Sequence, residues 1–169
     1  MKNNYLIWIT GISGVGKTTF AKKIYNQLKK SNDKIIILDG DKMREMLFKS
    51  EKFSHYSKKN RLQLAKIYSN FCKLLYDQGF TVIIATISLF KEIHSLNRKK
   101  FKNYCEIYIK RSNANLIKQK LKTNLNNKKN IVGYDINIDE PLKPHFLLED
   151  IKKSELNNYA KKIIKFICK

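Results

Sequence analysis

The chain has 169 residues, of which 43% are hydrophobic and 29% are charged, as in an ordinary globular protein. Its longest apolar run, FTVIIATISLF, is far too short to span a membrane, and the early run YLIWIT is too short for the apolar core of a signal peptide. Three widely spaced cysteines without a Cys-x-x-Cys pair argue against a disulfide framework and a zinc site. These exclusions indicate a soluble, cytoplasmic protein with no membrane partner, and the length suits a single domain over residues 1–169.

The charge is strongly basic. Lys and Arg number 35 against 14 Asp and Glu, so the formal net charge is +21. Such an excess fits a nucleic acid, an acidic membrane or a polyanionic small molecule as the partner. It also fits lysine used as a general surface residue, because Lys, Asn and Ile are frequent along the whole chain.

Five short apolar runs predict strands, at residues 5–10, 34–38, 80–87, 105–109 and 145–149. They lack strict alternation of polar and apolar residues, which is typical of strands that are covered on both faces. Helical patterns lie between and after them, at 17–30, 57–78, 89–101 and 154–169. Strands that alternate with helices predict right-handed βαβ units, a mainly parallel five-stranded sheet and an α/β fold.

The segment 57–78 carries a clear apolar stripe, formed by Leu64, Tyr68, Phe71, Cys72 and Leu75. Gly79 follows this segment as a predicted C-terminal cap, and Ser88 and Ser154 are predicted N-caps of the two later helices. The residues that we further expect in the core are Trp8, Cys72, Cys105 and Cys168.

The stretch GISGVGKT, Gly11–Thr18, matches the phosphate-binding pattern G-x-x-x-x-G-K-[ST] in full, between a predicted strand and a predicted helix. Its glycines let the backbone N–H groups turn toward phosphates at the helix N-terminus. Lys17 is predicted to reach the β- and γ-phosphates of ATP, and Thr18 to bind Mg²⁺. The predicted phosphate-binding residues are Gly11, Ser13, Gly14, Val15, Gly16, Lys17, Thr18 and Thr19. The fold class is then a P-loop NTPase, a three-layer α/β/α sandwich.

A charged stretch, LDGDKMR, follows the second predicted strand and places Asp39 and Asp41 on either side of Gly40. The Asp-x-x-Gly and Asn-Lys-x-Asp motifs of GTPases are missing from the sequence, so the pattern favours a small kinase. Carboxylates at this point can orient an acceptor hydroxyl or hold magnesium, and we predict catalytic roles for Lys17, Asp41 and Asp39, with Asp41 also as a metal ligand. The alternative is that Asp41 caps a helix while Asp39 is solvated.

Five stretches, GISGVGKTT, LDGDKMR, YSKKNR, DQGFTVIIATIS and VGYDINIDEP, resemble in order the motifs of the adenylylsulfate (APS) kinase family over nearly the whole chain. The resemblance implies a kinase that moves the γ-phosphate of ATP to the ribose 3′-hydroxyl of a nucleotide whose 5′-phosphate carries a tetrahedral anion. It also implies a lid at about 111–135 and, since relatives are often dimers, leaves a homodimer open.

The resemblance assigns substrate-binding roles as well. Arg44 and Arg61 would hold the acceptor's phosphate and anion, and Tyr56 would stack on its base. The other acceptor-site and lid residues that it implies are Ile87, Ser88, Ile131 and Gly133. His94 is a further candidate for an anion contact, because the family tends to have a basic residue there.

Departures from the family pattern concern the acceptor. Ile131 stands where the family has a lid phenylalanine that stacks on adenine, and Leu64 stands where it has an asparagine. Stacking on an aromatic side chain is worth about 1–3 kcal/mol, so this loss would weaken the binding of a purine. The drift resembles the branch of the family that acts on cytidine diphosphoramidate, in the assembly of phosphoramidate groups on bacterial capsules.

Two alternatives stay open. One is an APS kinase of sulfate assimilation. The other is a nucleic-acid-binding P-loop ATPase, which the charge of +21 suggests but which the lack of basic clusters interleaved with aromatic residues disfavours. The leading hypothesis has a small nucleotide as partner, and no nucleic acid.

Overall fold

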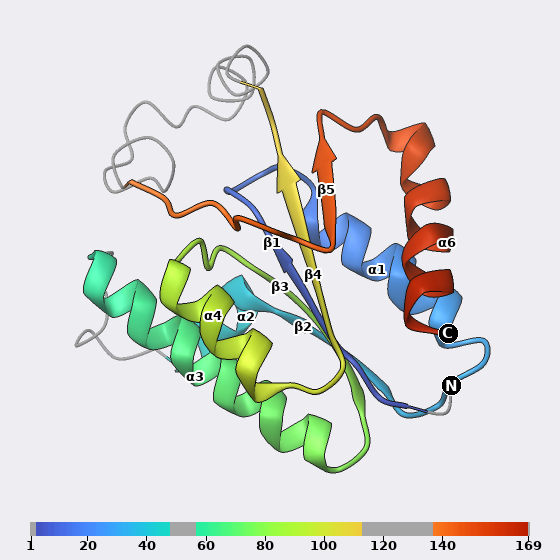
Figure 1. The fold of residues 1–169 in the computed structure, drawn as a ribbon, viewed down its shortest axis with the longest axis horizontal. Coiled ribbons are helices and arrows are strands. Elements are labelled where there is room, and N and C mark those ends of the chain that lie inside the picture. Colours follow the sequence, from blue (N-terminus) through green and yellow to red (C-terminus); the bar gives the residue numbers. More distant parts are fainter. Residues whose placement is uncertain (1–2, 48–56, 113–136, 169) are drawn as a thin grey trace.

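The computed structural model describes residues 3–47, 57–112 and 137–168 (Figure 1). The strands are β1 (Leu6–Thr10), β2 (Ile35–Asp39), β3 (Thr81–Thr86), β4 (Tyr104–Lys110) and β5 (Phe146–Glu149). The helices are α1 (Lys17–Leu28), α2 (Gly40–Leu47), α3 (Lys58–Asp77), α4 (Lys91–Lys100), the 3-10 turn η3 (Lys153–Glu155) and α6 (Leu156–Ile167). All five predicted strands are confirmed, with bounds that shift by at most one residue.

One sheet joins the five strands in the order β2-β3-β1-β4-β5, and every neighbouring pair is parallel. This confirms the predicted α/β class with its parallel sheet. In the register, Thr10 lies opposite Thr86 and Asp39 lies opposite Ala85. Because β1, β2 and β3 run in the same direction, their carboxyl ends meet at one edge of the sheet. The phosphate loop and the LDGDKMR stretch therefore start side by side.

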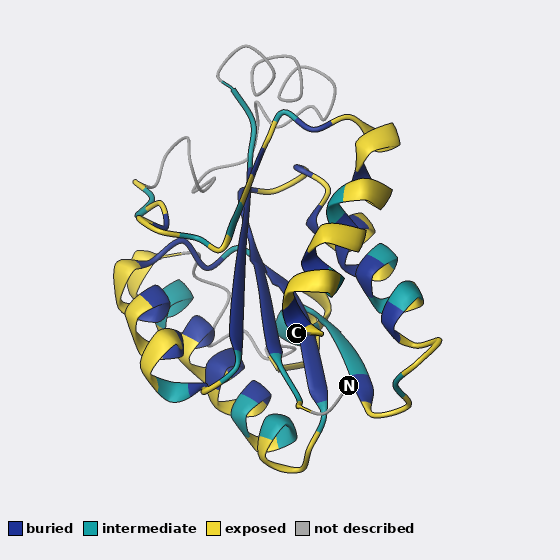
Figure 2. Ribbon diagram, turned by 45° about the vertical axis from the view of Figure 1, so that its right-hand side comes forward, coloured by how far each residue is buried: buried dark blue, intermediate teal, exposed yellow. Residues whose placement is uncertain are grey.

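Helices cover both faces of the sheet, which completes the three layers (Figure 1). Within β1, Leu6 and Trp8 pack toward α3 and α4, whereas Ile7 and Ile9 pack toward α1 and α6. This alternation follows from the two-residue repeat of a strand. Figure 2 shows buried strands between helices whose outer faces are exposed. The prediction that the strands are covered on both faces is confirmed for β1, β3 and β4. It is wrong for the edge strand β5, where Leu147 is 52% exposed, and β2 is only partly buried. No helix in the described part of the chain is long and apolar enough to cross a membrane.

The predicted end of the long helix is confirmed, because α3 ends at Asp77 and Gly79 then adopts a φ of 86°, the conformation common after helices. Two N-cap predictions are wrong. Ser88 does not cap α4, which starts after Phe90, and the Ser88 hydroxyl lies 3.0 Å from that of Thr86 instead. Ser154 falls inside η3.

Two core predictions are also wrong. Phe71 is 41% exposed on α3, and Cys168 is exposed after the last helix. Cys72, Cys105 and Trp8 are buried as predicted.

Candidate active site

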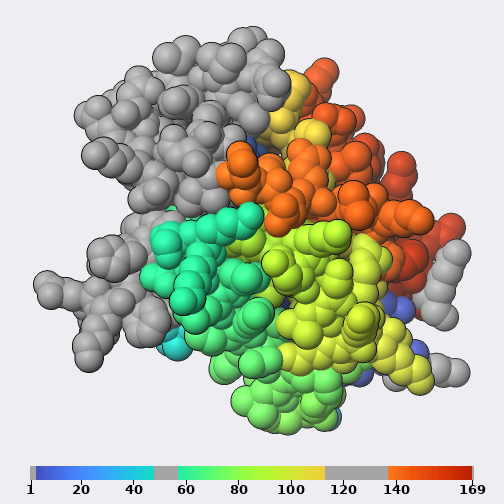
Figure 3. All heavy atoms as spheres, turned by 60° about the vertical axis from the view of Figure 1, so that its left-hand side comes forward, coloured from blue at the N-terminus to red at the C-terminus, as the bar shows by residue number. Residues whose placement is uncertain are grey.

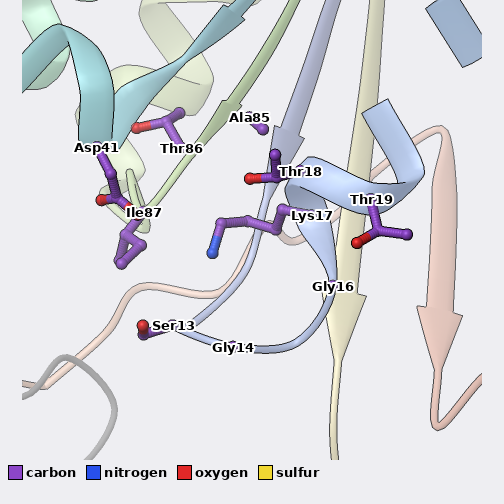
Figure 4. Close-up of a pocket in the computed structure, with 10 residues that line it drawn as sticks. All are labelled: Ser13, Gly14, Gly16, Lys17, Thr18, Thr19, Asp41, Ala85, Thr86 and Ile87. Atoms are coloured by element: carbon purple, nitrogen blue, oxygen red, sulfur yellow. The ribbon is translucent and has the colours of Figure 1, made fainter. Parts of the chain in front are cut away.

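The phosphate loop joins β1 to α1 and bends around a hollow of about 250 Å³ (Figure 4). Gly16 precedes α1 with a φ of 99°, a conformation that a side chain disfavours. The loop residues that line the hollow are Ser13, Gly14, Gly16, Lys17, Thr18 and Thr19, and across from them lie Asp41, Ala85, Thr86 and Ile87. The two remaining predicted loop residues, Gly11 and Val15, pack against the protein interior. A Cβ at Gly11 would overlap the Ile109 carbonyl oxygen, and Val15 is buried in the core.

Lys17 is buried at the base of the loop, where its Nζ donates a hydrogen bond to the carbonyl oxygen of Ile12 at 2.7 Å. Burial lowers the pKa of this ammonium group to about 8, and the carboxylates of Asp41 and Asp39 oppose the shift. A buried cation with so few partners favours an anionic ligand that supplies the missing charge. Figure 4 shows the nitrogen directed into the hollow.

Asp39 connects the loop to α2. The Thr18 hydroxyl donates to Asp39 Oδ2 at 2.7 Å, while Asp39 Oδ1 accepts the backbone N–H groups of Asp41 and Lys42 at 3.0 and 3.3 Å. Asp39 therefore caps α2, which reverses the alternative that assigned the cap to Asp41. The exposed Asp41 carboxylate is left to line the hollow.

A second hollow adjoins the first, between α2, α3 and the end of β3. It is lined by Gly40, Asp41, Arg44, Arg61, Leu64, Ala65, Tyr68, Thr86, Ile87 and Ser88. Four of the predicted acceptor-site residues, Arg44, Arg61, Ile87 and Ser88, thus lie together although they come from three segments of the chain. Asp41, Thr86 and Ile87 line both hollows, so a group bound in one would face a group bound in the other.

Tyr56, Ile131 and Gly133 lie outside the described residues, as does the predicted lid apart from Arg111 and Ser112. Their roles as base contact and lid contacts stay predictions of the resemblance.

Comparison with known proteins decides the family. The family model described as adenylylsulphate kinase matches residues 3–149. The cytidine diphosphoramidate kinase of Campylobacter jejuni is 44% identical over 149 residues, which cover 83% of this chain and 84% of that protein. The chain belongs to the adenylylsulphate kinase family. It is an ATP-dependent phosphotransferase, which confirms the prediction from its motifs.

Two further similarities concern a curated relative and a solved structure. A probable adenylyl-sulfate kinase of Pyrococcus abyssi is 33% identical over 148 residues, with 83% of this chain and 82% of that protein covered. The structure of Mycobacterium tuberculosis APS kinase in complex with AMPPNP and APS superposes with a TM-score of 0.82 at 22% identity, covering 99% of each chain. That likeness supports the P-loop kinase fold.

The residues present fit a magnesium ion in this kinase. The exposed Thr18 hydroxyl and the partly buried Asp39 carboxylate form a pair of oxygen ligands beside the phosphate hollow. Mg²⁺ in nucleotide sites is held by one or two protein oxygens together with substrate phosphates and water. The structure therefore favours Asp39 over Asp41 as the carboxylate next to Thr18, and the assignment of Asp41 as a metal ligand stays a prediction.

Sequence reasoning misjudged His94. It is buried, its Nδ1 lies 2.6 Å from Glu106 Oε1, and Arg98 donates to the other Glu106 oxygen. Its Nε2 lies 3.3 Å from the carbonyl oxygen of Asp139, in the segment that follows the undescribed stretch 113–136 and lies next to α4 (Figure 3). The predicted anion contact is therefore replaced by contacts with the buried Glu106, which forms an ion pair with Arg98 and a hydrogen bond with His94. The sequence did contain a signal for this contact: Glu106 lies between two apolar residues of a predicted buried strand, and a buried carboxylate needs a charged or hydrogen-bonding partner.

Tyr68 and Thr86 were missed as site residues. Tyr68 belongs to the apolar stripe of α3, where a tyrosine reads as core, and Thr86 ends a buried strand. Both line the second hollow. Only the hydroxyl group of each residue, which the apolar pattern ignores, distinguishes it from a packing residue.

Proposed function

We propose that this kinase transfers the γ-phosphate of ATP to the ribose 3′-hydroxyl of an activated nucleotide, cytidine diphosphoramidate. The observation that carries the reaction is the wall shared by the two hollows, formed by Asp41, Thr86 and Ile87. A phosphate chain in the loop and a ribose in the second hollow would meet at this wall. Phosphoryl transfer needs such an in-line meeting of donor and acceptor more than it needs covalent participation by the protein.

The chain's own groups divide the work. Backbone N–H groups of the loop and the Lys17 ammonium hold the β- and γ-phosphates, and the guanidinium groups of Arg44 and Arg61 hold the anion of the acceptor. Asp41 orients the 3′-hydroxyl and takes its proton as the new O–P bond forms. The bond from the γ-phosphorus to the bridging oxygen breaks at the same time, and ADP leaves with that oxygen.

Mg²⁺ bound with ATP neutralises charge on the phosphate oxygens. Thr18 and Asp39 would hold it, since their 2.7 Å hydrogen bond joins a hydroxyl and a carboxylate at the edge of the phosphate hollow. Asp39 also fixes the first turn of α2, so the same carboxylate links the donor site to the helix that carries Asp41.

The choice of cytidine diphosphoramidate rests on two observations. The C. jejuni enzyme named for this substrate is 44% identical to the chain, against 33% for the P. abyssi protein named as a probable adenylyl-sulfate kinase. Within the second hollow, the buried Leu64 stands where the family has an asparagine. An altered acceptor pocket supports an altered acceptor, and the reaction would then serve capsule phosphoramidate assembly.

The test is an acceptor screen with ATP and Mg²⁺ that offers cytidine diphosphoramidate and APS side by side, with ADP release as the readout. We expect a higher kcat/KM with cytidine diphosphoramidate. A preference for APS would overturn the acceptor and leave the reaction type intact. ATP hydrolysis that RNA or DNA stimulates, with steep salt dependence and no nucleotide product, would overturn both.

Three further features are part of the proposal. The chain acts as a single kinase domain over residues 1–169 and works in the cytoplasm, and a homodimer is its possible assembly, since relatives are often dimers. Light scattering on the purified protein measures the dimer directly.

A further inference from the structure

Tyr68 is a buried tyrosine whose hydroxyl has a specific partner. It lies on α3 with 3% of its surface exposed, and its OH donates to the carbonyl oxygen of Gly40 at 2.6 Å. Burial raises the pKa of this phenol; the Arg44 charge opposes that shift, and Asp41 and Asp39 add to it. The hydroxyl therefore stays protonated and remains a donor throughout the working range of the enzyme.

Gly40, the residue that receives this hydrogen bond, lies between the two aspartates. It is buried against the end of β3, since a Cβ added there would come within 2.9 Å of Thr86 Oγ1 and 3.0 Å of the Ala85 carbonyl oxygen. The peptide at Gly40 is thus fixed by two long-range contacts, with β3 through close packing and with α3 through the tyrosine hydroxyl. Only glycine leaves room for this approach.

The first turn of α2 carries the chemistry. Asp39 precedes Gly40, Asp41 follows it, and Arg44 lies one turn further along the same helix. A shift of the Gly40 peptide moves Asp41 and Arg44 together, because α2 is short and starts at this residue, whereas the Asp39 carboxylate is also held by the Thr18 hydroxyl of α1. Tyr68 is also a wall residue of the second hollow, whereas the phosphate hollow is lined without it.

We propose that Tyr68 is a positioning residue for phosphoryl transfer, which sets the placement of Asp41 and Arg44 at the acceptor hollow through the Gly40 carbonyl. The proposal rests on the proposed function for the reaction but is independent of which nucleotide is the acceptor. A displacement of about 1 Å in a reacting group can cost on the order of a hundredfold in rate. We therefore expect loss of the hydroxyl to lower kcat/KM for the acceptor by about 10–100-fold and to leave ATP binding within twofold.

The test is Tyr68→Phe, which removes one oxygen and keeps the ring. Tyr76→Phe is the matched control: Tyr76 lies on the same helix, and its hydroxyl accepts the backbone N–H of Asn103 at 3.2 Å, away from both hollows. Affinity for AMPPNP and kcat/KM for whichever acceptor the wild type uses are compared in the two variants. A selective loss of acceptor kcat/KM in Tyr68→Phe alone supports the proposal. An acceptor kcat/KM within twofold of wild type, or an equal loss in both variants, overturns it.

Amide hydrogen exchange provides a readout that needs no acceptor. In AMPPNP-bound protein, Tyr68→Phe should speed exchange in α2 and leave α1 unchanged, whereas Tyr76→Phe should leave both unchanged. Unchanged exchange in α2 overturns the positioning role even if no acceptor is found. If exchange in α2 rises but the wild type phosphorylates no nucleotide, the positioning of α2 stands and the proposed function fails.

Discussion

Exchanging the two aspartates of LDGDKMR for asparagine, one at a time, separates their roles. Asp39→Asn keeps an oxygen that can accept the N–H groups of Asp41 and Lys42, and Asn caps helices about as well as Asp. The stability cost is then the lost helix-dipole interaction, about 0.3–1 kcal/mol, plus about 1 kcal/mol because the Thr18 hydroxyl meets a neutral group in place of a charged acceptor. For a chain of this size, that lowers the Tm by no more than about 8 °C.

The catalytic cost of Asp39→Asn is larger. Its carboxylate accepts a 2.7 Å hydrogen bond from the Thr18 hydroxyl, and the substitution replaces this charged acceptor with a neutral amide. Loss of a group that supports a metal site costs about 10–100-fold in metal affinity or activity, and we expect a loss of that size in kcat/KM. Because the lost charge lies where we place magnesium, the Mg²⁺ concentration for half-maximal rate should rise, and high Mg²⁺ should restore part of the activity.

Asp41→Asn should give a different pattern. Asp41 lies on the wall between the hollows, and loss of a positioned proton acceptor costs about 10²–10⁴-fold in rate. We expect that loss in kcat, with the Mg²⁺ requirement and AMPPNP affinity unchanged. Asp33→Asn, which removes an exposed carboxylate from the loop before β2, is the control for a simple change of charge.

The assay couples ADP release to NADH oxidation and titrates Mg²⁺ for each variant. If Asp41→Asn keeps near-wild-type kcat, the assignment of Asp41 as the proton acceptor is wrong. If Asp39→Asn loses kcat without any change in the Mg²⁺ titration, the metal role of Asp39 is wrong and the two residues exchange places in the mechanism.

Three further outcomes follow from the site and the core. Because burial lowers the pKa of Lys17 to about 8 and phosphates bind its charged form, AMPPNP affinity should be flat below pH 8 and fall up to tenfold per pH unit above it; affinity that stays constant to pH 9.5 contradicts this. Removal of divalent ions with EDTA should abolish phosphoryl transfer, and Mg²⁺ should restore it; full activity in EDTA contradicts the metal role. Glu106→Gln breaks a buried carboxylate's contacts with His94 and Arg98, so it should cost about 3–5 kcal/mol, seen as a Tm lower by about 6–20 °C. Burial raises the pKa of Glu106, but His94 and Arg98 outweigh it and leave the pKa below its ordinary 4.5. Its stabilisation is therefore present above about pH 4.5 and lost as the pH falls toward the folded-state pKa, a loss that the variant should not show.

The phosphate loop was predictable because its chemistry is local. Eight consecutive residues supply the turn, the backbone N–H groups and the cation, and the flanking strand and helix confirm the context. The sheet was predictable as parallel for a similar reason, since strand and helix patterns alternate along the chain. The strand order β2-β3-β1-β4-β5 required the three-dimensional structure.

The roles within LDGDKMR depended on where the chain turns, which the sequence left open. Because α2 starts at Gly40, the cap falls to Asp39 and the Asp41 carboxylate is left to face the hollows. His94 failed for a related reason: its partner Glu106 is brought to it only by the pairing of β4 within the sheet. For the two aspartates and for His94, the sequence correctly indicated polar side chains with specific partners. Which partners they have depends on residues that are distant in the sequence and close in the fold.

The phosphate loop and the acceptor hollow are supported from opposite faces of the sheet. The acceptor of the reaction can therefore change while ATP remains the phosphate donor. The loop and α1 pack with α6 in one apolar cluster, whereas α3, with Leu64 and Tyr68, packs in the other. They meet at the carboxyl edge of the sheet, where Asp41 and Thr86 border both hollows. A substitution on the α3 side therefore alters the acceptor wall without repacking the phosphate loop. This separation of the two clusters explains how Leu64 can replace the family's asparagine while the Gly11–Thr18 loop keeps the full phosphate-binding pattern.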